Sequence, residues 1–166
     1  PHAEIVDYAL QRGCVLVAAS GNDGDRVRYF PAAAEGVIAV GSVGPSGAPS
    51  SFSSRGDHVV VSAPGEKIWS ATLDDGYRHN TGTSFAAPFV TGACALLLAR
   101  AARYGQPLSG EDLRELLRVT AKPFAAGLDH TGCGAGILDI SAALAALEQV
   151  LATRSRSRLV RAPAHP

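Results

Sequence analysis

A serine at the start of an apolar segment is the side chain of this sequence best suited to chemistry. Residues 82–88 read Gly-Thr-Ser-Phe-Ala-Ala-Pro, so the Ser84 hydroxyl stands where a long apolar helix is expected to begin. Free N–H groups and the dipole at a helix N-terminus favour the negative charge that a reacting serine develops. Gly82 allows a substrate backbone to approach closely, and Thr83 keeps the surroundings small. The segment therefore predicts a nucleophilic serine.

An asparagine at the end of an expected strand supplies a second reactive group upstream. Residues 15–23 read Val-Leu-Val-Ala-Ala-Ser-Gly-Asn-Asp, an apolar strand followed by a glycine turn that presents the Asn22 amide. An amide N–H aimed at a reacting carbonyl can stabilise its oxyanion. Ser84 and Asn22 together predict acyl transfer at a carbonyl group.

The elements that must position these residues alternate as in an α/β protein. Continuous apolar character indicates strands buried on both faces, as in a mostly parallel sheet; such runs occupy residues 14–19, 37–43 and 59–63. A short strand at 68–71 and a turn at 74–76 predict a hairpin that leads into Tyr77, with residues 77–81 as a polar loop.

Four helices are expected around this sheet. They span residues 3–12, ended by Gly13; Ser84 to about Arg103; a segment capped by Ser109 with Asp112 at the capping-box position; and about Ser141 to Leu151. The helix from Ser84 is apolar on nearly every face, which is typical of a helix buried inside a domain. Pro88 is expected in its first turn, where a missing N–H is tolerated.

Length, composition and charge limit the classes of function. With 166 residues, 46% of them hydrophobic and 18% charged, the chain is expected to form one globular domain over 1–151, followed by a disordered Arg/Ser/Pro-rich tail over 152–166. No apolar run approaches the roughly 18 residues of a membrane span, so none is expected. Four of the fifteen Lys and Arg residues follow Leu151, so the expected domain carries eleven basic and fifteen acidic residues. Because binding to nucleic acid depends on clustered positive charge, nucleic acid is not an expected partner.

Cysteines and loop carboxylates indicate neither a disulfide scaffold nor a metal site. Cys14 and Cys94 are expected to be small core residues, and a Cys94–Cys133 bridge is left open. Asp23 and Asp25 lie in a glycine turn and are expected to be solvated. Methionine is absent, so we expect the chain to be part of a longer protein.

Several segments, in order, resemble the subtilisin-like serine proteases (subtilases, peptidase family S8). Residues 80–93 resemble the family's nucleophile segment and residues 18–22 its oxyanion-asparagine segment. Further segments resemble its core strands, a loop and the entry to its final helix; they are residues 37–41, 52–56, 61–65 and 134–139. The resemblance implies the C-terminal part of a catalytic domain, with a partial subtilisin-like fold and a buried central helix starting at the nucleophile.

The resemblance also implies roles for individual residues. Ser84 would be the nucleophile, and Asn22 would donate to the oxyanion alongside the Ser84 backbone N–H. Substrate-binding positions would be Ala19, Ser20 and Gly21, which line the pocket for the residue before the cut bond, together with Gly82 and Thr83. The family implies no cofactor beyond calcium, for which the chain offers no expected site, and it is commonly secreted.

The family's aspartate and histidine motifs do not occur in this sequence. We therefore expect a serine endopeptidase fragment that acts on peptides or proteins when the N-terminal part of the same catalytic domain is present, and that is inactive alone. A non-catalytic pseudoprotease or peptide-binding module is the alternative. An α/β-hydrolase esterase using Asp129 and His165 is a weaker one, and a dyad of Ser84 with His79 is weaker still.

Overall fold

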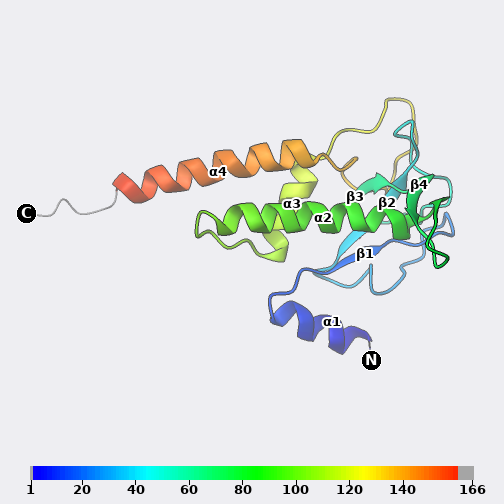
Figure 1. The fold of residues 1–166 in the computed structure, drawn as a ribbon, viewed down its shortest axis with the longest axis horizontal. Coiled ribbons are helices and arrows are strands. Elements are labelled where there is room, and N and C mark those ends of the chain that lie inside the picture. Colours follow the sequence, from blue (N-terminus) through cyan, green and yellow to red (C-terminus); the bar gives the residue numbers. More distant parts are fainter. Residues whose placement is uncertain (1, 161–166) are drawn as a thin grey trace, which may run out of the picture.

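A computed structural model describes residues 2–160 of the chain, and side chains from Ala3 to Thr153. Nine elements follow one another along these residues (Figure 1). They are α1 (His2–Gln11), β1 (Val17–Ala19), β2 (Ile38–Val43), β3 (Val59–Pro64), β4 (Ile68–Ala71), β5 (Tyr77–Asn80), α2 (Thr83–Ala102), α3 (Gly110–Thr120) and α4 (Ile140–Val160).

The central sheet is parallel and has the strand order β1-β2-β3. Val17 is opposite Ile38 in the first pairing, and Val40 is opposite Val61 in the second. Every residue of β2 is buried, as expected for a strand covered on both faces. The α/β class and the parallel sheet flanked by helices are therefore confirmed, and β4 pairs with β5 across the predicted turn as a separate antiparallel pair.

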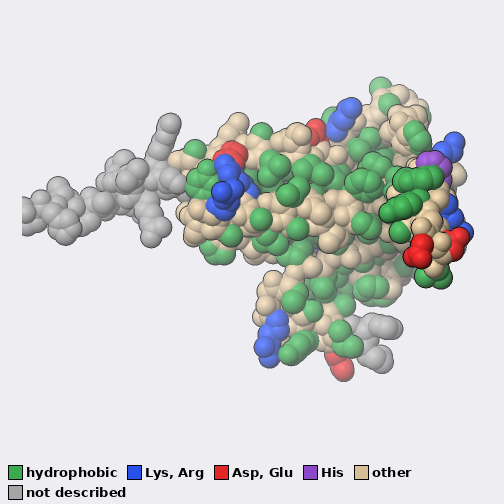
Figure 2. All heavy atoms as spheres, in the orientation of Figure 1, with side chains coloured by type: hydrophobic (Ala, Val, Ile, Leu, Met, Phe, Trp, Pro, Cys, Tyr) green, Lys and Arg blue, Asp and Glu red, His purple; other side chains and the backbone are tan. Residues whose placement is uncertain are grey.

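Helix α2 lies across this sheet with one face buried and the other exposed. Ala86, Val90 and Leu97 have no solvent exposure, because this face packs against all three parallel strands. On the opposite face Phe89 is 40% and Leu96 53% exposed, and hydrophobic side chains gather along the helix on the side shown in Figure 2. The predicted central helix is thus covered on one side only within residues 3–153.

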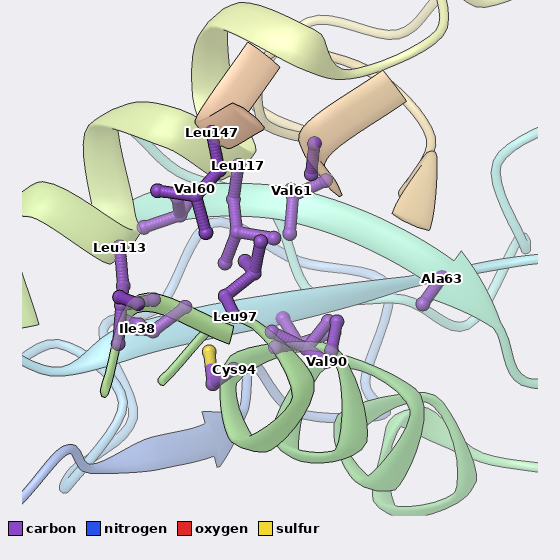
Figure 3. Close-up of a cluster of buried hydrophobic side chains, with 14 of the residues drawn as sticks. Ile38, Val60, Val61, Ala63, Val90, Cys94, Leu97, Leu113, Leu117 and Leu147 are labelled. Atoms are coloured by element: carbon purple, nitrogen blue, oxygen red, sulfur yellow. The ribbon is translucent and has the colours of Figure 1, made fainter. Parts of the chain in front are cut away.

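The hydrophobic core lies between the sheet and three helices (Figure 3). Leu97 of α2 meets Leu113 and Leu117 of α3 and Leu147 of α4, and each of these leucines is at most 2% exposed. Both outer helices begin at a side chain that caps the first turn, and the cap at Ser109 was predicted. The Ser109 hydroxyl accepts a bond from the Asp112 N–H in a full capping box, and Asp139 accepts one from the N–H of Ala142.

By length and composition, α2 is also the one helix within the described residues that could cross a membrane. The sequence predicted no span, because polar residues interrupt this apolar segment. In the structure, the contacts of α2 with the sheet explain the apolar character of its buried face, since core helices have the same composition.

Three boundaries differ from the sequence prediction. Helix α2 begins at Thr83, so Pro88 is its sixth residue and lies beyond the first turn, where it was expected. Because proline has no N–H, the carbonyl group of Ser84 does not receive the usual helical hydrogen bond from residue 88. Residues 77–80 are a strand because they pair with β4. Helix α4 continues nine residues past Leu151 to Val160, since no glycine or proline interrupts it. The disordered tail was therefore predicted to begin too early. Residues 161–166 of that tail lie outside the described residues.

The cysteines divide into one exposed and two buried thiols. Cys94 is buried as expected, whereas Cys14 is exposed and the prediction of a core position for it was wrong, because it precedes β1 at the border of the sheet. Cys94 and Cys133 are both free, so the bridge that the sequence left open is not formed. Burial raises the pKa of the Cys94 thiol to about 11.

One buried histidine lacks hydrogen-bond partners among the described residues. His58 is 8% exposed, neither ring nitrogen has a partner there, and its nearest carboxylate oxygen, on Asp57, is 3.9 Å away. Burial, followed by the charge of Arg28, lowers the His58 pKa below its ordinary value of 6.5. Protonation of His58 therefore opposes folding.

The pH dependence of stability tests this statement. Below about pH 6.5 the unfolded chain binds a proton at His58 more readily than the folded chain, so the free energy of unfolding should fall as the pH is lowered from 7.5 to 5. In His58→Phe this fall should be smaller, as measured by urea unfolding at both pH values. An equal fall in the wild type and the variant would contradict the assignment.

Candidate active site

Ser84 is the second residue of α2 and is exposed. The chain enters the helix through Gly82, whose φ of 152° lies in the region that favours glycine. No hydrogen bond occupies the Ser84 hydroxyl among side chains 3–153. The helix start thus presents the Ser84 hydroxyl at the surface, and its role as a nucleophile stays a prediction.

Asn22 lies directly beside the start of this helix. Its Oδ1 accepts a bond from the Thr83 N–H at 2.8 Å and from the Thr83 hydroxyl at 2.9 Å. A Cβ added to Gly82 would lie 3.6 Å from Asn22 Nδ2, so the amide stands against the residues that precede Ser84. With Oδ1 facing Thr83, the Nδ2 hydrogens are left to donate elsewhere.

Thr83 has a positioning role that the sequence did not reveal. Its side chain is fully buried, and its hydroxyl lies 2.9 Å from Asn22 Oδ1 and 3.3 Å from the carbonyl oxygen of Gly21. Threonine and asparagine stand 61 residues apart in the chain, and no local pattern signals such a pair. Thr83 therefore fixes the orientation of Asn22 instead of only keeping the surroundings small.

The predicted substrate wall lies between β1 and Asn22. Ala19 and Gly21 are half-buried. Ser20 is fully buried, and its hydroxyl donates to the carbonyl oxygen of Ser54 at 2.9 Å, so its side chain faces the interior. Ser20 is therefore not accessible to a ligand in this structure, and its hydroxyl holds the turn to the neighbouring loop.

The carboxylates of this turn are engaged in local bonds. Asp25 accepts the hydroxyls of Ser54 at 3.2 Å and Tyr29 at 3.0 Å. Asp23, then Asp25, raise the pKa of the Tyr29 hydroxyl. Within residues 3–153 no group of three His, Cys, Asp or Glu side chains could hold a metal ion.

The rival partners considered for Ser84 are held elsewhere. His79 Nδ1 lies 2.8 Å from the carbonyl oxygen of Lys67, with which it shares a hydrogen bond. Asp129 pairs with Arg55 at 2.9 Å. His165 lies outside the described residues. The strand before Ser84 belongs to an antiparallel hairpin, whereas an α/β-hydrolase elbow follows a strand of the main sheet.

A close contact of two glycine segments joins β3 to the helix start. The Gly82 N–H donates to the carbonyl oxygen of Gly65 at 2.8 Å, and the Gly65 N–H to that of Val43 at 3.1 Å. A Cβ on Gly65 would lie 2.3 Å from Ser42 Oγ and 2.9 Å from the Gly82 carbonyl oxygen, which leaves no room for a side chain. Gly65 thereby sets the position of the segment that carries Ser84.

The whole arrangement defines an α/β protein whose candidate site, around Ser84, lies at the carboxyl ends of its parallel strands, the usual position of sites in open parallel sheets. The chain belongs to the subtilase family, whose model matches residues 2–136. The family predicted from the nucleophile and asparagine segments is therefore confirmed.

Relatives and solved structures agree with this assignment. The extracellular basic protease of Dichelobacter nodosus is 36% identical over 152 residues, which cover 86% of this chain and 25% of that protein. Subtilisin DY of Bacillus licheniformis is 36% identical over 144 residues, covering 84% and 50%. The patellamide maturation protease PatA superposes with a TM-score of 0.81 at 36% identity, covering 89% and 56%. The chain thus spans a quarter to a half of these curated relatives.

Substitution of Gly65 tests the close packing at the site. Gly65→Ala should lower the free energy of unfolding by about 1–3 kcal/mol, because the added methyl group must displace Ser42 or Gly82. Urea unfolding measures the change. Gly110→Ala is the control: no atom lies within 4 Å of its added Cβ, so stability should be unchanged or slightly higher. Equal effects of the two substitutions would contradict the account.

Proposed function

We propose that this chain supplies the nucleophile and the oxyanion-binding amide of a serine endopeptidase. The observation that carries the proposal is the pair of hydrogen bonds from Thr83 to Asn22 Oδ1, which hold the amide beside the residues that precede Ser84. Membership of the subtilase family and the protease names of the relatives support it.

In the proposed reaction, Ser84 Oγ attacks the carbonyl carbon of a peptide bond and gives its proton to a base. The carbonyl oxygen becomes an oxyanion, which accepts bonds from Asn22 Nδ2 and the Ser84 N–H. The base returns the proton to the leaving amine, and the acyl group stays on Ser84. Water then releases the acyl group by the same sequence of steps.

The base must come from residues other than the described side chains, none of which forms a hydrogen bond with the Ser84 hydroxyl. In subtilisin, loss of the serine or the histidine alone lowers turnover about 2 × 10⁶-fold, a value that belongs to that relative. We therefore propose that the 166-residue chain alone does not turn over substrate. Without a base, it would act as a peptide-binding module.

The exposed face of α2 is the proposed docking surface for the segment that supplies the base. This face begins at Ser84 and continues through Phe89, Ala95 and Leu96. Strand β1 pairs only with β2 within the described residues, so its other edge is also unpaired there and open to a docked segment. The occupant is a segment corresponding to the part of the relatives that this chain does not span. We refer to the chain joined to that segment as the completed enzyme.

Labelling by a fluorophosphonate tests the proposed nucleophile. The completed enzyme should be labelled and should cleave peptides, Ser84→Ala should do neither, and the chain alone should show neither reaction at a measurable rate. Mass spectrometry of the labelled peptide identifies the site. Labelling at another residue, or full activity of Ser84→Ala, would overturn the proposal, and a correctly folded but inert completed enzyme would favour a pseudoprotease.

Two surface variants of that experiment test the docking face. Ala95→Arg puts a charged side chain on the exposed face of α2. When the segment is added as a separate chain, it should not bind this variant, and Ser84 should not be labelled. Ala145→Arg, at an exposed position of α4, is the matched control and should leave labelling intact. Equal labelling of both variants would show that the segment docks elsewhere.

Asn22→Ala tests the oxyanion role. Removal of the amide donor should lower kcat of the completed enzyme by about 10²–10³, the range known for the corresponding subtilisin asparagine, with KM little changed. Thr83→Val, which removes the hydroxyl that contacts Asn22 Oδ1, should reduce kcat less, by about tenfold. A change in KM alone would assign Asn22 to substrate binding.

A further inference from the structure

The solvent-facing side of the β4–β5 hairpin carries aromatic rings that no part of the proposed mechanism uses. Trp69 is 61% and Tyr77 65% exposed, and their rings stack with centroids 6.2 Å apart and planes 11° apart. The His79 ring meets Trp69 edge-on at 4.8 Å. We call these three side chains the aromatic ledge. Hydrophobic side chains are also visible at this end of the molecule in Figure 2.

The ledge is held in place by bonds at the base of the hairpin. Trp69 is opposite His79 in the strand register. The Asn80 amide donates to Ser70 Oγ at 2.7 Å, and the Lys67 N–H donates to Thr81 Oγ1 at 3.0 Å. Fixed aromatic rings lose little conformational entropy when a ligand stacks on them, and exposed apolar clusters commonly mark binding surfaces.

The hairpin begins and ends beside the serine. Strand β4 starts three residues after Gly65 and β5 ends two residues before Gly82, the two glycines joined by a hydrogen bond. Asn22 follows β1 at one edge of the three-stranded sheet, and the hairpin follows β3 at the other. The ledge therefore lies on the opposite flank of Ser84 from Ala19–Gly21.

This placement assigns the ledge to one side of a bound peptide. The family resemblance implies that the wall at Ala19–Gly21 contacts the residue before the cut bond, so a peptide that crosses Ser84 would continue over the hairpin with the residues after that bond. Strand β5 rises about 3.3 Å per residue, as does an extended peptide. Tyr77 and His79 are two residues apart, so the ledge spans about three successive residues of such a peptide, and we take these as the second to fourth after the cut bond.

We propose that the aromatic ledge binds an aromatic side chain of the peptide substrate, at the second to fourth residue after the cut bond. The proposal rests on the proposed function, because it takes Ser84 as the point of attack. Stacking of a substrate ring on Trp69 and Tyr77 removes apolar area of both partners from water and adds the attraction between rings. The ledge would then make the enzyme prefer peptides that carry an aromatic residue in the segment released after the cut bond.

Peptide series with the completed enzyme test the ledge. In each peptide Phe replaces Ala at the second, third or fourth residue after the cut bond, and kcat/KM is measured. At the best position Phe should raise kcat/KM about three- to tenfold. In Trp69→Ala/Tyr77→Ala the ratio of kcat/KM for the Phe peptide to that for the Ala peptide should fall below twofold, because the substrate ring no longer stacks on Trp69 and Tyr77.

The control substitution is Leu73→Ala. Leu73 is fully exposed in the turn between the strands and is not part of the stack, so its loss should leave the preference for Phe intact. A preference that survives loss of both rings, or that occurs only at residues before the cut bond, would overturn the proposal. Equal kcat/KM for the Phe and Ala peptides at all three positions would overturn it as well.

Binding to the Ser84→Ala completed enzyme separates this proposal from the proposed function. Fluorescence anisotropy of labelled peptides should show about three- to tenfold tighter binding of the Phe peptide than of the Ala peptide, and equal binding when both rings are removed. If the wild type cleaves nothing, the proposed function fails, and the anisotropy result still decides the ledge. Equal affinities for both peptides would end the proposal even where cleavage is observed.

Discussion

The contact of Thr83 with Asn22 Oδ1 joins the two halves of the site. Two hydrogen bonds cross from the first turn of α2 to the loop after β1, and they leave one side of the amide directed outward. Without them, Asn22 would be an exposed side chain in a glycine turn with several rotamers available. Because a buried threonine makes the bonds, the amide is oriented by the core and not by the solvent-exposed turn.

The contact depends in turn on how closely β3 approaches the helix start. Gly65 and Gly82 meet backbone to backbone, and a side chain on Gly65 would collide with Ser42 and with the Gly82 carbonyl group. The same glycines anchor the hairpin that carries Trp69 and Tyr77. Asn22 follows β1, whereas the ledge and Ser84 follow β3, so all three are connected to the carboxyl ends of strands in the same sheet.

The sequence predicted the features that depend on residues close together in the chain, and it missed those that depend on residues far apart. Strands β2 and β3 are apolar because both faces are buried, and the capping box at Ser109 lies within four residues, so both could be found from pattern alone. The residue types of the two segments predicted a shared reaction, but the pairing of Asn22 with Thr83 spans 61 residues and no local pattern could show it. The exposure of Cys14 and the strand at 77–80 were missed because sheet borders and strand pairing depend on distant residues.

The half-covered α2 connects the fold to the proposed chemistry. Phe89 and Leu96 are 40% and 53% exposed, so covering them would stabilise a docked segment by about 1 kcal/mol each, beyond what small neighbours such as Ala95 add. That face starts at Ser84, so any segment that buries it also comes to lie against the nucleophile. The apolar contacts that hold such a segment would bring its side chains within reach of the Ser84 hydroxyl. Stability of the assembled protein and reactivity of the serine would then depend on the same surface.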